Sequence, residues 1–433
     1  MILLWITLAA ACLFLAGRRP FLLSPTAIFF GYFALVFPIS YLASYLFDLP
    51  SPLFSSPRAI AQGKIVFAFC QILLGLLAFC LGRFLIPAVK VHWPQIELIE
   101  SRFAPLIGIS LLMAFAGGFL VIRQVGGFSA LIENSGAIRS GGLRGLGAAS
   151  LAVTGLLPTV AQFALMRAFR QKARHIWIVL LVCVASCALG GLFGFRGVIL
   201  GMLLQVAAIC HVMTGRTYRR QVVAVIGALA LLVTALGYMR IMVTGQGEEV
   251  ETLISGNPSE AFAVISNNSL TRTRGVENVI TMSDYMEQSH FHYFLDNIQE
   301  TATAAIPSFI LPKDISLSEK IGTAVYSPYL MNVGIIEDVY GGVSYTLIAE
   351  GYWNLGLAGI VLVCLFWGYL LNVVEATASG DASGYLRTIV YKTIVGAMVL
   401  FVEVPQLGIN SILITLVMNL GVLAFLSVRV RLA

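Results

Sequence analysis

The stretch FAPLIGISLLMAFAGGFLVI, residues 103–122, contains no charged side chain and decides the class of fold. A helix of about 20 apolar residues is long enough to cross the hydrocarbon core of a bilayer. The sequence therefore predicts a membrane-spanning helix over these residues.

The rest of the chain has the same character. Of its 433 residues, 58% are hydrophobic and only 11% are charged, and the mean hydropathy is +0.90. This is far above the range of soluble domains, so we expect a polytopic, all-α integral membrane protein with a single transmembrane domain over residues 1–433. Apolar runs predict about eleven spans. They lie near residues 1–16, 24–47, 65–86, 103–122, 148–166, 176–193, 198–214, 221–241, 344–374, 386–402 and 406–428.

Cysteine usage and N-terminal composition exclude several alternatives. All 7 cysteines fall inside apolar runs, and none belongs to a CxxC motif or a Cys/His cluster. We therefore expect neither disulfides nor a metal site, and no cofactor. The first apolar run is followed rather than preceded by Arg18 and Arg19 and lacks a small-residue cleavage site, so it is interpreted as a span rather than a signal peptide.

Basic residues in the short loops set the expected orientation. With the predicted spans, every basic loop falls on the same side of the membrane, which the positive-inside rule identifies as the cytoplasm. The N-terminus is then periplasmic and the C-terminus cytoplasmic. The net charge of +6 is explained as a topology signal, and no nucleic-acid partner is indicated. The residues concerned are Arg18, Arg19, Lys90, Arg102, Arg167, Arg170, Lys172, Arg174, Arg216, Arg219, Arg220, Arg387, Lys392, Arg429 and Arg431.

Two loops face the periplasm in this arrangement. The smaller comprises residues 123–147, and the larger, residues 242–342, lies between predicted spans 8 and 9 and holds more than half of the acidic residues. Prolines at positions 307, 312 and 328 favour one or two short helices joined by turns over an independent domain. We expect this segment to pack on the mouth of the helix bundle.

Arginines on the periplasmic side need another explanation, because the insertion bias works against them. Arg139 and Arg144 lie in the glycine-rich sequence GAIRSGGLRGLG, and Arg272 and Arg274 lie in the larger loop. Guanidinium groups of this kind suit a multidentate anionic ligand, whereas a flexible loop with stray charges is the alternative. Arg196, in GGLFGFRGVIL between two spans, either faces a cavity or reaches to the membrane interface.

Three further side chains are candidate acid–base groups. From Ser283 onward, apolar residues recur with helical periodicity, which places His292 and Asp296 one turn apart on another face. A carboxylate that orients an imidazole suits proton abstraction, although most histidines on exposed helix faces have no such role. Glu350 lies in the stretch that re-enters the membrane and is the carboxylate nearest the expected cavity mouth.

The chain resembles the bacterial oligosaccharide repeat-unit polymerases, the Wzy-type O-antigen and exopolysaccharide polymerases. Its organisation is similar throughout, with two outer loops, and three stretches carry the resemblance. These are GGFSALIENSGAIRSGG at 126–142, GFRG at 194–197 and GGVSYTLIAEGYWNLGLAG at 341–359.

This resemblance implies a metal-independent C-type glycosyltransferase of the bacterial inner membrane. It would join undecaprenyl pyrophosphate-linked oligosaccharides, a donor and an acceptor, at the periplasmic face, and a chain-length co-polymerase is a candidate partner. The residues agree with this: Arg139, Arg144, Arg196, Arg272 and Arg274 would hold pyrophosphate. A base, either His292 with Asp296 or Glu350, would deprotonate the acceptor hydroxyl.

Two other functions remain open at this point. An O-antigen ligase has the same C-type features and differs in its acceptor. A flippase for lipid-linked oligosaccharide would instead show internal repeats, short loops and charges within the spans. The sequence shows no repeat and nearly charge-free spans, which favours an enzyme over a transporter.

Overall fold

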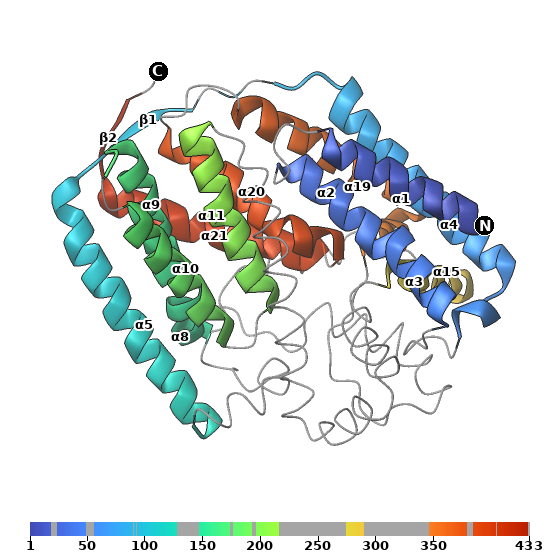
Figure 1. The fold of residues 1–433 in the computed structure, drawn as a ribbon, viewed down its shortest axis with the longest axis horizontal. Helices are drawn as coiled ribbons and strands as arrows, with labels where there is room; N and C mark the ends of the chain where they lie inside the picture. The colour runs from blue at the N-terminus through green and yellow to red at the C-terminus, as the bar shows by residue number, and fades with distance from the viewer. Residues whose placement is uncertain are drawn as a thin grey trace.

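The fold is a bundle of helices (Figure 1). The computed structural model describes residues 1–18, 24–48, 56–89, 91, 93–127, 147–173, 176–192, 196–215, 274–289, 346–378, 384–403 and 405–431. Nearly all of these residues are helical, which confirms the expected all-α class, and two short strands are the exception.

The elements follow the apolar runs of the sequence. In the N-terminal half they are α1 (Ile2–Gly17), α2 (Pro25–Ala34), η1 (Leu35–Ile39), α3 (Ser40–Phe47), η2 (Pro57–Ala59), α4 (Gln62–Cys80), η3 (Leu81–Leu85), β1 (Gln95–Leu98), η4 (Glu100–Arg102), α5 (Phe103–Val125), α8 (Gly147–Leu151), η6 (Ala152–Leu156), α9 (Leu157–Arg170), α10 (Ile176–Leu192) and α11 (Arg196–Thr214). The C-terminal half contains α15 (Gly275–Ser289), α19 (Leu347–Ala378), α20 (Tyr385–Glu403), α21 (Pro405–Leu426) and β2 (Ser427–Arg431).

Seven helical segments among the described residues are long and apolar enough to cross a membrane. They are Pro25–Phe47, Gln62–Leu85, Glu100–Gln124, Ala149–Arg170, Leu347–Thr377, Tyr385–Val402 and Gly408–Leu426. Three shorter apolar helices accompany them, at Ile2–Gly17, Ile176–Ser186 and Leu200–Thr214. The protein is thus an all-α membrane protein. The predicted span 221–241 lies outside the described residues, and the total of about eleven spans stays a prediction.

Two hydrophobic cores hold the bundle together. The larger joins α1, α2, α4, α15 and α19, and the smaller joins α5, α9, α10 and α21 (Figure 1). Helices α11, α20 and α21 contribute to both cores. Helix α20 is the most buried of the seven spans, because it packs against α2, α11, α19 and α21.

Glycines allow the helices to cross closely. A Cβ atom on Gly82 would overlap the backbone oxygen of Leu365, and one on Gly368 would overlap that of Phe79. Gly201 and Gly396 form a similar contact, because a Cβ on Gly201 would lie 2.7 Å from the oxygen of Gly396. Such contacts are typical of membrane helices, where small residues let backbones approach and increase van der Waals packing.

One end of the bundle is held by a buried arginine that sequence analysis did not single out. Arg83 donates from Nε to the hydroxyl of Thr26 at 2.8 Å, and its other nitrogens bond to Asn372 and Glu375. Glu375 also accepts from the backbone N–H of Thr26 at 2.8 Å. This guanidinium therefore joins the ends of α2, η3 and α19, and we call the group the Arg83 cluster.

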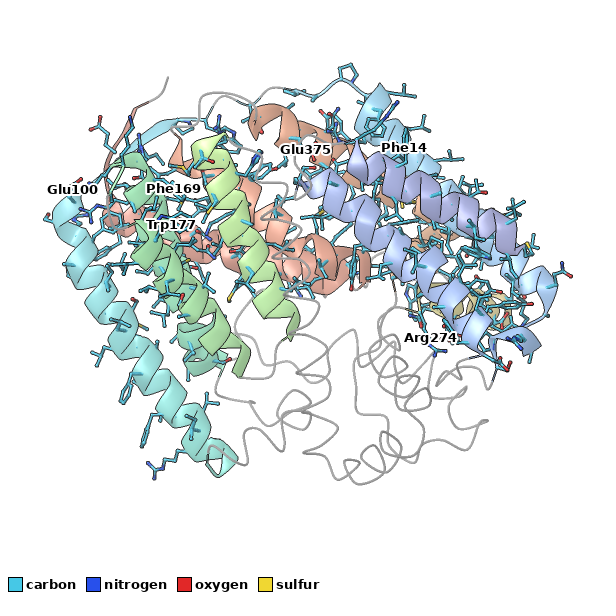
Figure 2. The ribbon with its side chains drawn as sticks, viewed as in Figure 1. Phe14, Glu100, Phe169, Trp177, Arg274 and Glu375 are labelled. Carbon is cyan, nitrogen blue, oxygen red and sulfur yellow. The ribbon has the colours of Figure 1, made fainter. Side chains whose placement is uncertain are left out.

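The same end carries several of the residues expected in the cytoplasm. Arg102 donates to the carbonyl of Phe425 at 2.8 Å, and Arg167 lies 3.5 Å from Glu100. Figure 2 places Glu100, Phe169 and Glu375 toward one end and Arg274 toward the other. The alternation of all the basic loops stays a prediction, because several of them lie outside the described residues. Which end faces the cytoplasm stays a prediction.

Lys392 differs from the other residues that were assigned to the topology signal. Its side chain is completely buried in α20 and bonds to Gln162 of α9. A buried lysine needs a polar partner inside the bundle. Lys392 is therefore explained by its contact with another helix and does not indicate which side of the membrane its loop faces.

Strand β1 pairs with β2 in an antiparallel ladder from Gln95↔Arg431 to Leu98↔Ser427. The predicted span 406–428 therefore ends at Leu426, where the backbone leaves the helix and pairs with the segment before α5.

Candidate functional site

The structure describes three of the eight predicted site residues. Arg196 is the first residue of α11, and its side chain lies outside the described residues, whereas Arg274 and Glu350 are described in full. Five lie outside the described residues altogether: Arg139, Arg144, Arg272, His292 and Asp296. The site is therefore built from α15 and α19, which carry Arg274 and Glu350.

Helix α15 begins earlier than predicted. It spans Gly275–Ser289, whereas the sequence analysis started a helix at Ser283. Val276, Val279 and Ile280 give the spacing i, i+3, i+4, and all three are buried. This spacing predicts a helix from Val276, although the apolar repeat beyond Ser283 is denser. Gly275 permits the contact with η1, because a Cβ there would lie 2.7 Å from Val36.

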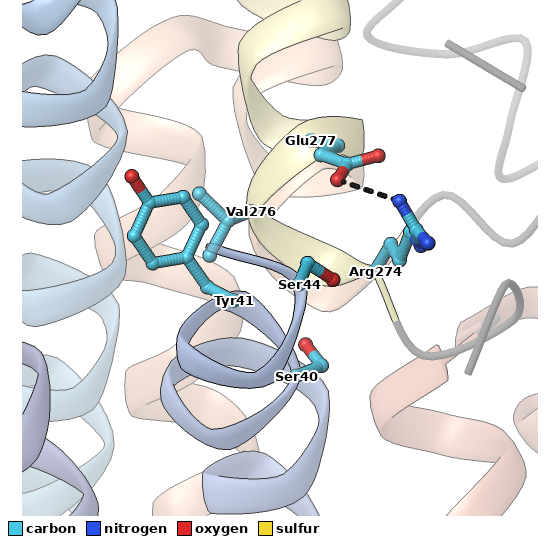
Figure 3. A pocket seen from close by; sticks show the side chains of 6 residues that line it. All are labelled: Ser40, Tyr41, Ser44, Arg274, Val276 and Glu277. Atoms are coloured by element: carbon cyan, nitrogen blue, oxygen red, sulfur yellow. Dashed lines mark hydrogen bonds and ion pairs between the residues drawn. The ribbon is translucent and has the colours of Figure 1, made fainter. Parts of the chain in front are cut away.

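Arg274 lies at the start of α15, inside a small pocket against η1 and α3. Its Nη1 lies 3.1 Å from a carboxylate oxygen of Glu277, and both side chains are only 3% exposed. Ser40, Tyr41, Ser44 and Val276 complete the lining (Figure 3). Arg274 is therefore half of a buried ion pair in the wall of a polar pocket, rather than an arginine on an open loop.

The second half of α15 is attached to α4 by polar contacts. Lys64 bonds to Asp284 at 2.6 Å, and Gln71 donates to the hydroxyl of Ser283 at 3.1 Å. Gln71 is completely buried and Asp284 is nearly so. A helix with charged and polar side chains buried against spans must be matched to specific partners, because each unmatched group would cost free energy.

Helix α15 also contacts α19, through stacked aromatic rings. The ring centroids of Tyr285 and Trp353 are 5.6 Å apart and the planes differ by 6°. Trp353 is 4% exposed, so this contact fixes the segment of α19 that carries Glu350.

Helix α19 corresponds to the predicted span 344–374 and is broken within it. Leu355 and Gly356 have non-helical backbone angles, and Gly356 adopts φ 60° and ψ −143°, a region that only glycine enters readily. A Cβ on Gly359 would overlap the backbone oxygen of Gly351. Residues eight apart are far too distant for this in a straight helix, so the chain folds back on itself.

The break divides α19 into a short segment, residues 347–354, and a long one after Gly356. Gly351 and Gly359 contact each other closely within this fold-back. Ile348 lies at the level of Gly75 in the middle of α4, and Tyr352 contacts Phe67 nearer its start. The short segment thus begins deep among the spans.

Glu350 lies in the first turn of the short segment, where a negative charge is favoured by the helix dipole. Its Oε2 atom is buried and forms no hydrogen bond to the described residues. One turn later, Asn354 donates from Nδ2 to the backbone oxygen of Glu350 at 2.9 Å. The Oδ1 atom of Asn354 is likewise buried and without a partner in the described chain.

Sequence reasoning missed Glu277, Asp284 and Asn354 as residues of this region. Glu277 follows Arg274 by three residues, a spacing that favours an ion pair on a helix and could have been noticed. Asp284 and Asn354 depend on long-range packing that no local pattern reveals. Within the described ranges, no group of three or more His, Cys, Asp or Glu side chains could hold a metal ion.

In comparisons with known proteins, no family model, no curated protein and no solved structure matches the chain.

Proposed function

We propose that the protein is a glycosyltransferase that joins undecaprenyl pyrophosphate-linked oligosaccharide repeat units into O-antigen or exopolysaccharide at the periplasmic face of the inner membrane. One observation supports this most: α15, from the long segment assigned to the periplasm, is buried with its charged side chains against α3, α4 and the broken α19. Polar and charged side chains gathered at one end of an apolar bundle suit a substrate with a lipid tail and a sugar head.

The chemistry needs a base and an anion site. A base takes the proton of the acceptor hydroxyl, the oxygen bonds to the anomeric carbon of the donor glycan, and the bond from that carbon to pyrophosphate breaks. Undecaprenyl pyrophosphate leaves with the bonding electrons. Arginines stabilise the charge that develops on it, because they bind the leaving group more strongly in the transition state than in the substrate.

Roles are assigned as far as the residues support them. Arg139, Arg144, Arg196 and Arg272 are proposed as pyrophosphate ligands. Arg274 shapes the pocket through Glu277, and binding to phosphate would require it to exchange or share that partner. Glu350 is favoured as the base over His292 with Asp296, because its buried oxygen forms no hydrogen bond to the described residues.

A second candidate function has one observation in its favour. Transporters often bind substrate where a membrane helix is interrupted, and α19 is interrupted at Leu355–Gly356. A flippase for lipid-linked oligosaccharide would move the substrate without forming a glycosidic bond. An O-antigen ligase would form the bond only with a different acceptor lipid.

The test is chain growth by purified protein in lipid nanodiscs supplied with lipid-linked repeat units. Wild-type protein should lengthen the glycan, and Arg272→Ala should slow this by about a hundredfold to a thousandfold, as expected when one charged transition-state contact is lost. Arg123→Ala, an exposed arginine in the last turn of α5, is the matched control and should keep full activity. Transport without bond formation would identify a flippase. Transfer only to a foreign lipid acceptor would identify a ligase.

A further inference from the structure

The short segment of α19 carries two buried acceptor oxygens on one face. They are Oε2 of Glu350 and Oδ1 of Asn354, and neither forms a hydrogen bond to the described residues. Residues four apart on a helix lie on the same side, so the two side chains that carry these oxygens are neighbours. We call them the acceptor pair.

The identity of the free atom on Asn354 follows from its hydrogen bond. The group 2.9 Å from the backbone oxygen of Glu350 must be a donor, which assigns it as the amide nitrogen. The remaining atom is then the amide oxygen. Both free atoms of the pair are therefore acceptors, and a ligand that satisfies them must supply at least two donors.

Such a pair is costly to bury without a partner. A carboxylate away from water needs hydrogen-bond donors or a cation, and no described basic side chain forms an ion pair with Glu350. Asn419 of α21 provides a contrast, because it also bonds to the backbone four residues earlier and leaves its Oδ1 without a partner. Only the α19 segment combines such an amide with a buried carboxylate one turn away among the described residues.

Two neighbouring acceptors suit the hydroxyl and amide N–H groups of a sugar. Adjacent ring substituents present several neutral donors at fixed spacing, and they form strong hydrogen bonds with a charged acceptor. The stacked rings of Trp353 and Tyr285 fix the orientation of the short segment. The acceptor pair is therefore preorganised before a ligand binds.

We infer that the acceptor pair is a sugar subsite, in which Glu350 and Asn354 accept hydrogen bonds from ring substituents of a lipid-linked glycan. This inference rests on the proposed function and adds to it the part of the substrate that the site recognises, which is the sugar. Asn354 is the specificity-determining residue of the subsite. A sugar that lacks a matching donor would leave a buried oxygen unpaired and be rejected.

The experiment measures binding to protein in nanodiscs, without requiring catalysis. The probes are bare undecaprenyl pyrophosphate and the same lipid carrying one glucose, galactose, N-acetylglucosamine or N-acetylgalactosamine. Wild-type protein should bind at least one sugar-bearing probe about tenfold or more tightly than the bare lipid, as one hydrogen bond to a charged group provides. Asn354→Leu and Glu350→Gln should each remove that advantage and leave binding of the bare lipid unchanged.

Asn419→Leu is the matched control, because it deletes the same local amide arrangement away from the pair. It should keep the sugar preference, and thermal unfolding of all variants should stay close to that of wild type. The inference is overturned if wild type prefers no sugar-bearing probe, if the preference survives both substitutions, or if Asn419→Leu removes it too. A sugar preference that depends on the pair, together with no chain growth, would reject the polymerase while leaving the subsite in place.

Discussion

Two buried arginine–glutamate pairs lie toward opposite ends of the molecule, and they differ in what they connect (Figure 2). Arg83 and Glu375 are far apart in sequence, and their cluster joins three elements. Arg274 and Glu277 are three residues apart in one helix and line a pocket. The first pair joins separate elements at one end of the bundle, whereas the second lies within one helix in the wall of a small pocket.

The difference shows that burial alone does not identify a functional charge. Both arginines are at most 7% exposed. Arg83 is held by helices that cross through Gly82 and Gly368, so it cannot move without separating them. Arg274 precedes a short helix whose attachment to α4 includes the half-exposed Lys64. Of the two arginines, Arg274 is therefore the better candidate for contact with substrate.

The largest expected effect is the loss of the Arg83 cluster. Arg83→Ala should lower the free energy of unfolding by about 3–5 kcal/mol, because it leaves the Glu375 carboxylate buried without its cation. Reversible unfolding in mixed micelles measures this. The double variant Arg83→Met with Glu375→Leu should regain part of the loss, since no charge is then stranded. An unchanged single variant would mean that this pair does not hold the bundle.

A smaller effect is expected at the other pair. Arg274→Ala should lower the free energy of unfolding by about 1.5–3 kcal/mol, because it removes a charged contact within one helix, whereas Arg83→Ala also breaks contacts between three elements. Adding Glu277→Gln should restore most of it. Unfolding measurements come first, and chain growth is then measured on the stable double variant. Full activity there would limit Arg274 to a structural role, and lost activity would place it in contact with substrate.

The smallest effect is expected at the rim of α15. Lys64 is 48% exposed, so Lys64→Ala should lower the free energy of unfolding by no more than about 1 kcal/mol. The exposed Arg58–Asp48 pair is the control, and Asp48→Ala should change stability by a similarly small amount. A much larger loss for Lys64→Ala alone would show that α15 is anchored at its rim rather than by Gln71 and the aromatic stack.

Sequence patterns located most of the described helices and few of their partners. The predicted spans 103–122 and 386–402 agree with α5 and α20 within a few residues, because a bilayer requires long apolar runs with internally satisfied backbones. The fold-back in α19 was not predicted. LIAEGYWNLGLAG stays apolar through the break, and membrane helices tolerate glycine, so hydropathy cannot distinguish Gly356 from glycines in straight helices.

The candidate site was predicted in part for a related reason. Glu350 was selected by its position in an apolar stretch, which is a local signal. Arg83 and Asn354 carry no such signal: an arginine near a helix end resembles a topology marker, and an asparagine resembles any small polar residue. The bonds of Arg83 depend on Glu375, which is distant in sequence. The position of Asn354 depends on the local reversal of the chain in α19.

The β1–β2 ladder has a consequence for the order of assembly. Glu97 of β1 pairs with Arg429 of β2. Strand β1 therefore cannot pair until β2 has been synthesised, which happens after every span described above. Contacts of such high sequence separation form late and slowly, because the loop they close must be ordered first. Helix α5, which follows β1, is therefore synthesised long before its position relative to α21 is fixed by this ladder. The two strands would therefore pair only after both neighbouring helices, α5 and α21, have been synthesised.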